Sequence, residues 1–258
     1  MIAPPYPPAH DLLKGKTVLV TAAAGTGIGF ATAKRCAEEG AKVVLSDVHE
    51  RRLGEAAEKI AAITGATPPT VLCNVTVEAE VERMFATTIA AVGPIDVLVN
   101  NAGLGGTANV VDMTDAEWTK VLDVTLNGTF RCMRAALRHM TPRKSGVIVN
   151  NASVLGWRAQ AGQAHYAAAK AGVMALTRCA AIEAAPSGVR INAVAPSLAM
   201  HPFLAKVTTP ELLDELAARE AFGRPAEPWE IANVIVFLAS EYSTYMTGEI
   251  VSVSSQRA

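Results

Sequence analysis

Short runs of apolar, largely β-branched residues alternate along this chain with longer, alanine-rich stretches in which apolar residues recur at helical spacing. A strand that is apolar at nearly every position needs cover on both faces, which is typical of a parallel sheet with helices on either side. Because right-handed crossovers join such strands, the pattern predicts an α/β fold built on one doubly wound parallel sheet.

The alternation predicts about seven strands and the helices that connect them. The predicted strands are Lys16–Thr21, Lys42–Asp47, Thr70–Asn74, Asp96–Asn100, Gly146–Asn151, Val189–Ala195 and Glu249–Val253. The predicted helices are Ile28–Glu39, Glu50–Ile63, Val77–Val92, one or two helices between Asp115 and His139, His165–Ala184 and Pro228–Ala239. The sequence has no internal repeat and no linker, so residues 13–258 are expected to form one domain with a Rossmann-type sheet.

Two segments depart from this alternation. Residues 1–12 begin Met-Ile-Ala-Pro-Pro-Tyr-Pro-Pro and lack the charged and apolar regions of a signal peptide. They predict a proline-rich N-terminal arm, expected to be an unstructured tail, with packing on a neighbouring subunit as the alternative. Residues 197–226 carry several prolines around a leucine-rich piece, and an insertion at the carboxyl side of such a sheet is typical of a loop that shapes a substrate pocket.

Composition excludes several classes of protein. The net charge is −1 and charged residues make up 18% of the chain, so no basic excess points to nucleic acid. No apolar run reaches the roughly 18 residues of a membrane span. The cysteines lie in apolar or helical stretches without metal-ligand spacing, at Cys36, Cys73, Cys132 and Cys179. We therefore expect buried, reduced thiols, no metal site and a cytoplasmic protein.

A glycine-rich turn follows the first predicted strand and leads directly into a helix. It reads Ala24-Gly25-Thr26-Gly27-Ile28-Gly29. Small residues let the backbone approach a pyrophosphate, and the helix N-terminus supplies amide donors and positive partial charge. The order of strand, glycines and helix indicates a dinucleotide site, and an ordinary strand-to-helix turn is the alternative.

Asp47 ends the second predicted strand, about twenty residues beyond the glycine-rich turn. A carboxylate there can accept hydrogen bonds from both ribose hydroxyls and would repel a 2′-phosphate. The sequence therefore favours NAD(H) over NADP(H). Arg51 and Arg52 could reach a phosphate, but we expect them on the solvent face of the next helix.

Tyr166 and Lys170 are four residues apart in a predicted helix, so their side chains project from one face. Ser153 follows the fifth predicted strand, at the edge where open α/β sheets place their sites. A carbonyl that accepts a hydride must also gain a proton, and a free tyrosine titrates near pH ~10. A nearby ammonium would favour the tyrosinate, and a serine hydroxyl can hold the substrate oxygen. The alternative is a surface Tyr-Lys pair beside a strand-end serine.

From about Leu13 to Ser254 the chain resembles the short-chain dehydrogenase/reductase family. The matching pieces are Gly27-Ile28-Gly29, Asn100-Asn101-Ala102-Gly103, Ser153, Tyr166-Ala-Ala-Ala-Lys170 and Arg190-Ile-Asn-Ala-Val-Ala-Pro196. The resemblance implies a nicotinamide cofactor and a homotetramer. It implies Tyr166 as the general acid/base and Ser153 as the donor to the substrate oxygen. It gives Lys170 two tasks, lowering the tyrosine pKa and binding the nicotinamide ribose.

The resemblance also implies the residues that contact the cofactor. They are Gly25, Thr26, Gly27, Ile28, Gly29, Asp47, Val48, Asn74, Val75, Asn101, Ala102, Gly103, Tyr166, Lys170, Pro196 and Leu198. Some positions differ from the family pattern. Ala22 or Ala23 replaces the first glycine, Asn74 stands in place of an aspartate at the adenine, and Ser197 follows Pro196 in place of a glycine.

The family's catalytic asparagine aligns with Thr125, and Asn127 lies two residues later. Asn127 would project about 200° around the helix from Thr125, toward the other face. We expect Thr125 to take the role through its backbone carbonyl, which in the family holds a proton-relay water. Asn127 is the alternative.

A narrower resemblance is to actinobacterial dehydrogenases of steroid ring C/D catabolism, which oxidise a ring hydroxyl of a hydroxy-methyl-indanone-propanoyl-CoA. It is carried by Thr21-Ala-Ala-Ala-Gly-Thr-Gly-Ile-Gly29, Asn151-Ala-Ser-Val-Leu-Gly-Trp-Arg-Ala-Gln160 and Val251-Ser-Val-Ser-Ser-Gln-Arg-Ala258. The resemblance implies a bulky, CoA-linked small-molecule substrate.

An apolar set of residues is expected to form the pocket wall, with ordinary core or lid packing as the alternative. It comprises Leu104, Val154, Leu155, Trp157, Leu198, Met200, Phe203 and Leu204. Arg158, His201 and Lys206 could meet a CoA phosphate, although solvated surface positions are the simpler interpretation. His165, beside Tyr166, is interpreted as a polar residue at a helix start rather than as a proton donor.

Three functions are compatible with the sequence. The first is an NAD-dependent alcohol dehydrogenase or ketone reductase acting on a bulky alicyclic substrate. The second is a 3-oxoacyl thioester reductase of the same fold. The third is a non-catalytic dinucleotide-binding sensor, against which the intact Ser153, Tyr166 and Lys170 argue, because a sensor needs no proton donor.

Overall fold

The computed structural model describes residues 3–200 and 209–256. Its strands form one seven-stranded sheet in which every pairing is parallel, in the order β3-β2-β1-β4-β5-β6-β7. The strands are β1 Thr17–Thr21, β2 Lys42–Asp47, β3 Thr70–Leu72, β4 Val97–Asn100, β5 Gly146–Asn151, β6 Val189–Pro196 and β7 Ile250–Val253. The order reverses between β1 and β4, which confirms the predicted doubly wound sheet.

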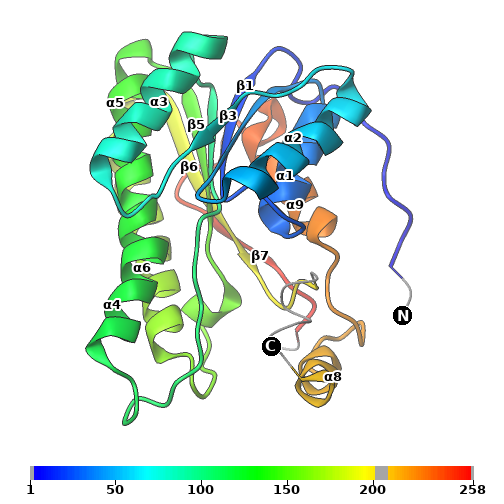
Figure 1. Ribbon diagram of the computed structural model, residues 1–258, viewed down its shortest axis with the longest axis vertical. Helices are drawn as coiled ribbons and strands as arrows, with labels where there is room; N and C mark the ends of the chain where they lie inside the picture. Colours follow the sequence, from blue (N-terminus) through cyan, green and yellow to red (C-terminus); the bar gives the residue numbers. More distant parts are fainter. Residues whose placement is uncertain (1–2, 201–208, 257–258) are drawn as a thin grey trace.

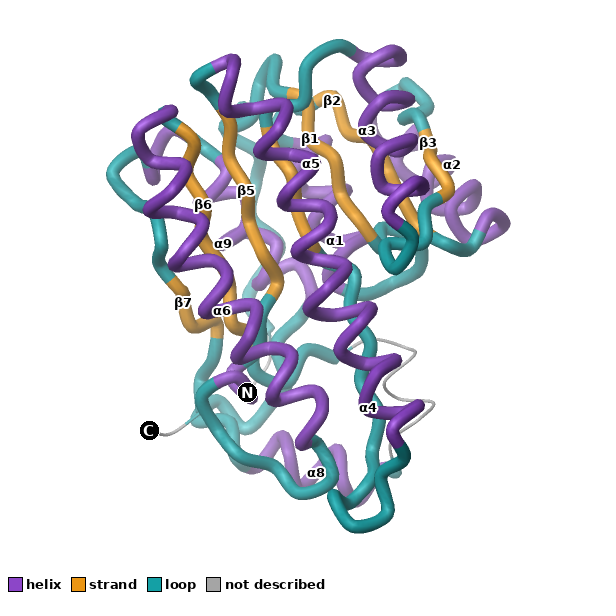
Figure 2. Tube along the Cα trace, turned by 90° about the vertical axis from the view of Figure 1, so that its left-hand side faces the viewer, coloured by secondary structure: helices purple, strands orange, loops and turns teal. Residues whose placement is uncertain are grey.

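Helices cover both faces of the sheet (Figures 1 and 2). The helices are α1 Ile28–Glu38, α2 Glu50–Thr64, α3 Glu78–Val92, α4 Asp115–Leu122, α5 Gly128–Arg143, α6 Ala164–Ala184, α8 Pro210–Ala218 and α9 Pro228–Ala239. A π-helix over Asp123–Asn127 joins α4 to α5, and short 3₁₀ turns cover Val154–Gly156, Ala185–Ser187 and Glu241–Ser243. Figure 1 shows α3, α5 and α6 on one side of the sheet and α1, α2 and α9 on the other.

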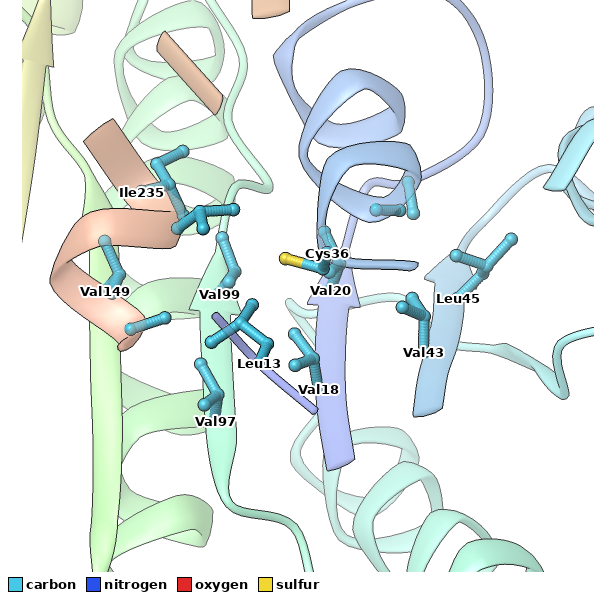
Figure 3. Packing of buried hydrophobic residues seen from close by; sticks show 14 of the residues in the cluster. Leu13, Val18, Val20, Cys36, Val43, Leu45, Val97, Val99, Val149 and Ile235 are labelled. Carbon is cyan, nitrogen blue, oxygen red and sulfur yellow. The ribbon is translucent and has the colours of Figure 1, made fainter. Parts of the chain in front are cut away.

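The strand side chains divide into two cores because successive residues point to opposite faces. In β1, Val18 and Val20 pack toward α1 and α9, whereas Leu19 packs on the opposite face. Figure 3 shows the first core, where Cys36 of α1 and Ile235 of α9 meet the valines of the central strands. Every residue of β1 is buried. This two-sided burial explains why the central strands are apolar throughout.

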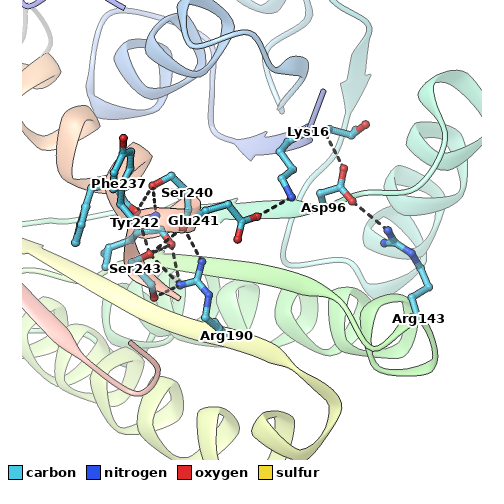
Figure 4. Close-up of polar contacts among 11 residues, drawn as sticks. Lys16, Asp96, Arg143, Arg190, Phe237, Ser240, Glu241, Tyr242 and Ser243 are labelled. Atoms are coloured by element: carbon cyan, nitrogen blue, oxygen red, sulfur yellow. Dashed lines mark hydrogen bonds and ion pairs between the residues drawn. The ribbon is translucent and has the colours of Figure 1, made fainter. Parts of the chain in front are cut away.

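Polar contacts close the amino edge of the sheet, opposite the edge where the site was predicted (Figure 4). The Lys16 ammonium lies 3.0 Å from a carboxylate oxygen of Glu241, and Arg143 lies 3.0 Å from Asp96. Arg190 donates to the carbonyl oxygens of Ser240 and Ser243 at 3.0 and 2.9 Å. These contacts tie the segment after α9 to the beginnings of the strands.

The N-terminal arm is ordered against α1, so the prediction of an unstructured tail is wrong for the described residues. Arg35 donates to the carbonyl oxygens of Pro7 and Pro8 at 3.0 and 2.9 Å. The buried Glu39 carboxylate accepts from the backbone N–H of Leu12 at 3.0 Å. The Tyr6 ring packs edge-on against Trp229 with centroids 5.3 Å apart. Contacts with distant residues, rather than local propensity, hold this arm.

Two further expectations need correction. Cys36, Cys73 and Cys132 are buried as predicted, but Cys179 is exposed on α6. The third strand ends at Leu72 rather than at Asn74, because Asn74 turns the chain.

Within the described residues, no helix is both long and apolar enough to span a membrane.

Candidate active site

Side chains at the carboxyl ends of β1, β4 and β5 bond to one another and define the edge of the site. The Thr21 hydroxyl accepts from the backbone N–H groups of Asn101 and Ala102 at 3.0 and 3.1 Å. The Asn101 amide donates to the Ala22 carbonyl at 3.1 Å and accepts from the Asn151 amide at 2.9 Å. Three strand ends are therefore held in register around the predicted cofactor cleft.

The glycine-rich turn has the conformation that a close approach requires. Ala22 adopts a left-handed φ of 50°, which is uncommon outside glycine and identifies it as the position that replaces the family's first glycine. Gly25 has a φ of 107°. A side chain at Gly29 would overlap the Ala22 carbonyl and the Asn101 amide, so only glycine fits there. Helix α1 then begins at Ile28 with no side-chain cap.

An uncapped helix N-terminus beside a glycine turn leaves backbone N–H groups free for an anion. These features fit the pyrophosphate of a dinucleotide. The neighbouring predicted residues, Thr26 and Gly27, lie in the same turn, with Thr26 exposed and Gly27 at the N-cap.

Asp47 lies at the end of β2 with its carboxylate facing the glycine turn. Its two oxygens accept from the backbone N–H groups of Ala24 and His49, each at 3.1 Å. Burial raises the pKa of Asp47, and hydrogen bonds from the backbone of Ala24 and Val48, together with the charge of Arg52, oppose the rise. Arg51 is paired with Glu55 in solvent, as expected, but Arg52 is partly buried and acts on Asp47. Val48 follows as an exposed residue.

The adenine-side residues are engaged with protein groups. The side-chain oxygen of Asn74 accepts from the Thr76 backbone N–H at 3.1 Å and from its hydroxyl at 2.9 Å. The acceptor that was expected to face adenine therefore stabilises a turn. The Val75 side chain is buried against Gly128, where an added Cβ would lie 2.6 Å from it.

The structure brings Ser153, Tyr166 and Lys170 together. Tyr166 lies in the first turn of α6 and Lys170 one turn later, with its ammonium 5.5 Å from the tyrosine ring centroid. The Lys170 ammonium donates to the Asn151 carbonyl at 2.5 Å, which fixes it beneath the end of β5. Ser153, the cap of the turn after β5, is hydrogen-bonded to Tyr166. The three groups therefore converge from two elements at one sheet edge.

The electrostatics of this trio are dominated by burial. Burial raises the pKa of Tyr166, and the hydrogen bond with Ser153 opposes that rise. The Lys170 ammonium, which we expect to favour the tyrosinate, does not contribute to this shift. Burial also lowers the pKa of Lys170 to about 8, because a buried ammonium loses its hydration. Burial therefore favours the neutral form of both side chains.

Thr125 lies buried in the π-helix, a kind of irregularity that is frequent at functional sites. Its hydroxyl accepts from the Leu104 N–H at 2.9 Å and donates to the Leu104 carbonyl at 3.1 Å. Its own carbonyl accepts from the Thr129 hydroxyl at 2.8 Å, so that oxygen already has a donor. Asn127 is exposed and donates to Asp123, on the other face as expected.

The side-chain contact of Thr125 with Leu104 is one that the sequence analysis missed, because it joins segments 21 residues apart. Gly103 lies between them and the trio, since a Cβ added there would be 3.4 Å from the Lys170 ammonium. His165 is buried and its Nδ1 accepts from the Tyr166 backbone N–H at 2.9 Å. This bond supports the interpretation of His165 as a residue that organises the helix start.

The predicted pocket wall is only partly described. Val154 is buried, Leu104, Leu155, Leu198 and Met200 are partly buried, and Trp157 is half exposed. Pro196 ends β6, and Leu198 follows with its carbonyl bonded to Ala226. Phe203, Leu204, His201 and Lys206 lie outside the described residues. Arg158 is exposed and hydrogen-bonded to Gln256 near the C-terminus.

Comparisons with known proteins agree with this geometry. The family model described as enoyl-(acyl carrier protein) reductase matches residues 22–255. The chain is 62% identical to the (5R,7aS)-5-hydroxy-7a-methyl-1-oxo-2,3,5,6,7,7a-hexahydro-1H-indene-carboxyl-CoA reductase of Mycobacterium tuberculosis, over 99% of this chain and 98% of the relative. It is 39% identical to the 3-oxoacyl-[acyl-carrier-protein] reductase FabG of Thermotoga maritima, over 93% of this chain and 97% of the relative.

A crystal structure of a short chain dehydrogenase from Mycobacterium smegmatis superposes with a TM-score of 0.88 at 58% identity, covering 100% of this chain and 99% of that one. The structure of levodione reductase superposes with a TM-score of 0.90 at 34% identity, covering 94% and 97%. The first of these likenesses extends over the whole chain.

Proposed function

The chain belongs to the short-chain dehydrogenase/reductase family, and we propose that it is an NAD(H)-dependent oxidoreductase that interconverts a secondary alcohol and a ketone on a bulky alicyclic, CoA-linked substrate of steroid ring degradation. The observation that carries the proposal is the convergence of Ser153, Tyr166 and Lys170 at the carboxyl edge of the sheet, beside the glycine turn.

The chain's own residues handle the proton. A bound nicotinamide supplies or accepts the hydride. Ser153 donates a hydrogen bond to the substrate oxygen, while the Tyr166 hydroxyl gives up its proton to that oxygen in reduction and takes it back in oxidation. The ammonium of Lys170, with its pKa lowered to about 8 by burial, stabilises the tyrosinate and can pass a proton toward solvent.

The substrate class rests on the 62% identical relative, whose printed name describes a methylated, bicyclic ketone with a ring hydroxyl and a CoA thioester. That name has the thioester on a ring carboxyl, whereas the resemblance in the sequence implied a propanoyl arm. The relative is named a reductase, so we propose ketone reduction as the direction to test first. The partly buried apolar side chains of Leu104, Leu155 and Leu198 suit an alicyclic ring.

Asp47 supports NAD(H) as the cofactor. Its carboxylate faces the glycine turn at the end of β2, where a ribose 2′-phosphate would meet a negative charge. The charge of Arg52 opposes the rise that burial causes in the pKa of Asp47, and Arg52 is the group that could accommodate NADP(H). Replacement of Asp47 by serine should reduce the NAD(H) to NADP(H) ratio of kcat/KM by at least tenfold, and an unchanged ratio would remove the role assigned to Asp47.

A homotetramer in the cytoplasm, without nucleic-acid or membrane partners, is part of the proposal. Large apolar side chains are exposed on three neighbouring helices, at Trp118, Phe130 and Ile182, the last 78% exposed. Exposed apolar groups on adjacent helices are typical of a subunit interface. Light scattering on the purified protein tests this, with a monomer as the contrary result.

The alternative activity is reduction of a 3-oxoacyl thioester, supported by the 39% identity to the FabG of Thermotoga maritima. Because this identity is lower than the 62% identity to the bicyclic-thioester reductase, a 3-oxoacyl substrate is less well supported than a bicyclic one. A dinucleotide-binding sensor is the alternative of another class, and the convergent trio speaks against it because binding alone needs no proton donor.

The decisive experiment follows absorbance at 340 nm with NADH and NADPH. The substrates are a bicyclic oxo-indane carboxyl-CoA, its propanoyl-CoA counterpart and acetoacetyl-CoA. We expect the highest kcat/KM with NADH and a bicyclic thioester. A higher kcat/KM with acetoacetyl-CoA would favour the acyl reductase, and cofactor binding without turnover of any ketone or alcohol would favour the sensor.

A further inference from the structure

A buried carboxylate outside the catalytic trio joins two segments of the chain at the substrate end of the sheet. Glu220 lies just after α8 and is 4% exposed. One carboxylate oxygen accepts from the Leu198 backbone N–H at 3.4 Å. The other accepts from the Ser255 backbone N–H at 3.2 Å and from the Ser255 hydroxyl at 2.9 Å. Among the described residues, the groups hydrogen-bonded to this carboxylate are all donors.

Glu220 has no cationic partner within ion-pair distance in residues 3–200 and 209–256. A buried carboxylate without a counter-ion is costly unless its oxygens are hydrogen-bonded, and here backbone and hydroxyl donors satisfy them. An amide could not replace it without loss, because the NH₂ group of glutamine would face a donor at one of the two positions. The site is therefore built for a carboxylate.

The two segments that Glu220 joins both lead to the predicted pocket. Leu198 belongs to the segment after β6, a strand that ends at Pro196 on the carboxyl edge of the sheet. Ser255 follows β7, and its carbonyl accepts from the Ala221 N–H at 2.6 Å. Figure 1 shows α8 at the same end of the molecule as the end of β7. Glu220 also pairs with Gln256 in an antiparallel bridge.

The C-terminal segment continues this connection toward the serine. The Gln256 side chain accepts from Arg158. The backbone N–H of Arg158 in turn donates to the Val154 carbonyl at 3.0 Å, in the turn that Ser153 caps. A path of direct contacts thus leads from Glu220 through the C-terminal segment to the residue beside the catalytic serine.

We propose that Glu220 is a positioning residue that fixes the substrate-side wall of the active site by holding the segment after β6 against the C-terminal segment. The inference rests on the proposed function of this site and adds a determinant of substrate affinity to it. Glu220 touches neither the trio nor the glycine turn. It holds Leu198, which is expected both in the pocket wall and at the cofactor, so its role is expressed more strongly in the KM of the ketone substrate than in cofactor affinity.

The test compares Glu220→Gln, Glu220→Ala and Ser255→Ala with the control Glu215→Gln. Glu215 lies on α8 with a solvent-exposed side chain, and in the described part of the chain its ion-pair partner is Arg219. We expect the first three variants to raise the KM of the bicyclic thioester by about five- to fiftyfold while the Kd of NADH rises by a smaller factor, because only Leu198 is shared with the cofactor contacts. The control should leave both values unchanged. Because Glu220 and Ser255 share one contact, the double variant Glu220→Gln with Ser255→Ala should change KM by less than the product of the single effects.

Amide hydrogen exchange on the intact protein supplies a readout that does not depend on turnover. Exchange at residues 197–200 and 254–256 should accelerate together in Ser255→Ala and Glu220→Gln, and remain unchanged in Glu215→Gln. If Glu220→Ala does not fold, these milder variants carry the test. A lowered Tm with KM within twofold of the wild type would make Glu220 merely structural and overturn the proposal. A wild type without ketone turnover would refute the proposed function, whereas uncoupled exchange at the two segments would refute the link itself.

Discussion

Replacement of Gly29 by alanine should impair cofactor binding through a steric conflict that the structure locates. A Cβ at this position would lie 2.2 Å from the Ala22 carbonyl oxygen and 2.4 Å from the Asn101 amide nitrogen. These two atoms are hydrogen-bonded to each other at 3.1 Å. The methyl group would therefore separate two partners that hold the glycine turn against the end of β4.

The magnitude follows from the overlap. Relief of about 1 Å of overlap must come from backbone on one side, so the cost should reach the 1–3 kcal/mol typical of overpacked sites. Because the displaced carbonyl belongs to the turn that would receive the pyrophosphate, we expect the Kd of NADH to rise at least tenfold. The substitution should also lower Tm by several degrees.

Gly54 offers a matched control in another helix. It is exposed in the middle of α2, and a Cβ there would have no atom within 4 Å. Alanine is a better helix former than glycine by about 1 kcal/mol, so Gly54→Ala should raise Tm by about 2–4 °C and leave NADH binding unchanged. Fluorescence titration with NADH and thermal unfolding measure both variants. Equal NADH affinities for Gly29→Ala and the wild type would refute the close-approach argument.

Three further predictions follow from other contacts. Tyr6→Ala should lower the free energy of unfolding by about 1 kcal/mol because it removes an edge-on ring contact and two cation–π contacts, with Lys34 and Arg35. Tyr245→Ala, at a fully exposed ring, should leave the free energy of unfolding unchanged in chemical denaturation. Thr125→Ala should lower kcat at least tenfold because it frees the loop after β4, whereas Asn127→Ala should retain kcat, and the reverse order in steady-state kinetics would contradict the geometry. Burial holds the pKa of Lys170 at about 8, below its ordinary 10.5, so the unfolded chain binds more protons between these values and stability should rise with pH there. The free energy of unfolding of the wild type should rise by up to about 3 kcal/mol more than that of Lys170→Met over this pH range. Equal pH slopes of the unfolding free energies of the two proteins would refute the prediction.

The sheet was predictable because a strand that is buried on both faces is apolar at nearly every position. All five residues of β1 are buried, and the run is correspondingly apolar or β-branched. The ends of strands were less predictable where a side chain forms local hydrogen bonds that compete with the backbone hydrogen bonds between strands. Asn74 bonds to Thr76 and turns the chain, which ends β3 two residues before the predicted boundary.

The arm was misjudged because proline-rich composition describes local conformation only. Its order comes from Arg35 and Glu39, whose side chains reach back from α1 to the backbone of Pro7, Pro8 and Leu12. The sequence does not indicate that Arg35 and Glu39 are buried, because arginine and glutamate side chains usually lie in solvent.

The residues of the site also divide into those that the sequence predicted and those that it did not. Tyr166 and Lys170 were found because helical spacing fixes their common face, and Ser153 because strand ends meet at one edge. The contact of Thr125 with Leu104 and the carboxylate of Glu220 were not found, because each depends on segments brought together by the tertiary fold.

The most direct measurement is the rate of ketone reduction at saturating NADH by Tyr166→Phe, compared with the wild type at 340 nm. Phenylalanine keeps the ring and removes only the hydroxyl that is hydrogen-bonded to Ser153. The account predicts a kcat lowered by about 10²–10⁴ with the Kd of NADH retained, since general acid catalysis contributes that much. A variant that binds NADH normally and turns over within tenfold of the wild type would show that the proton comes from elsewhere.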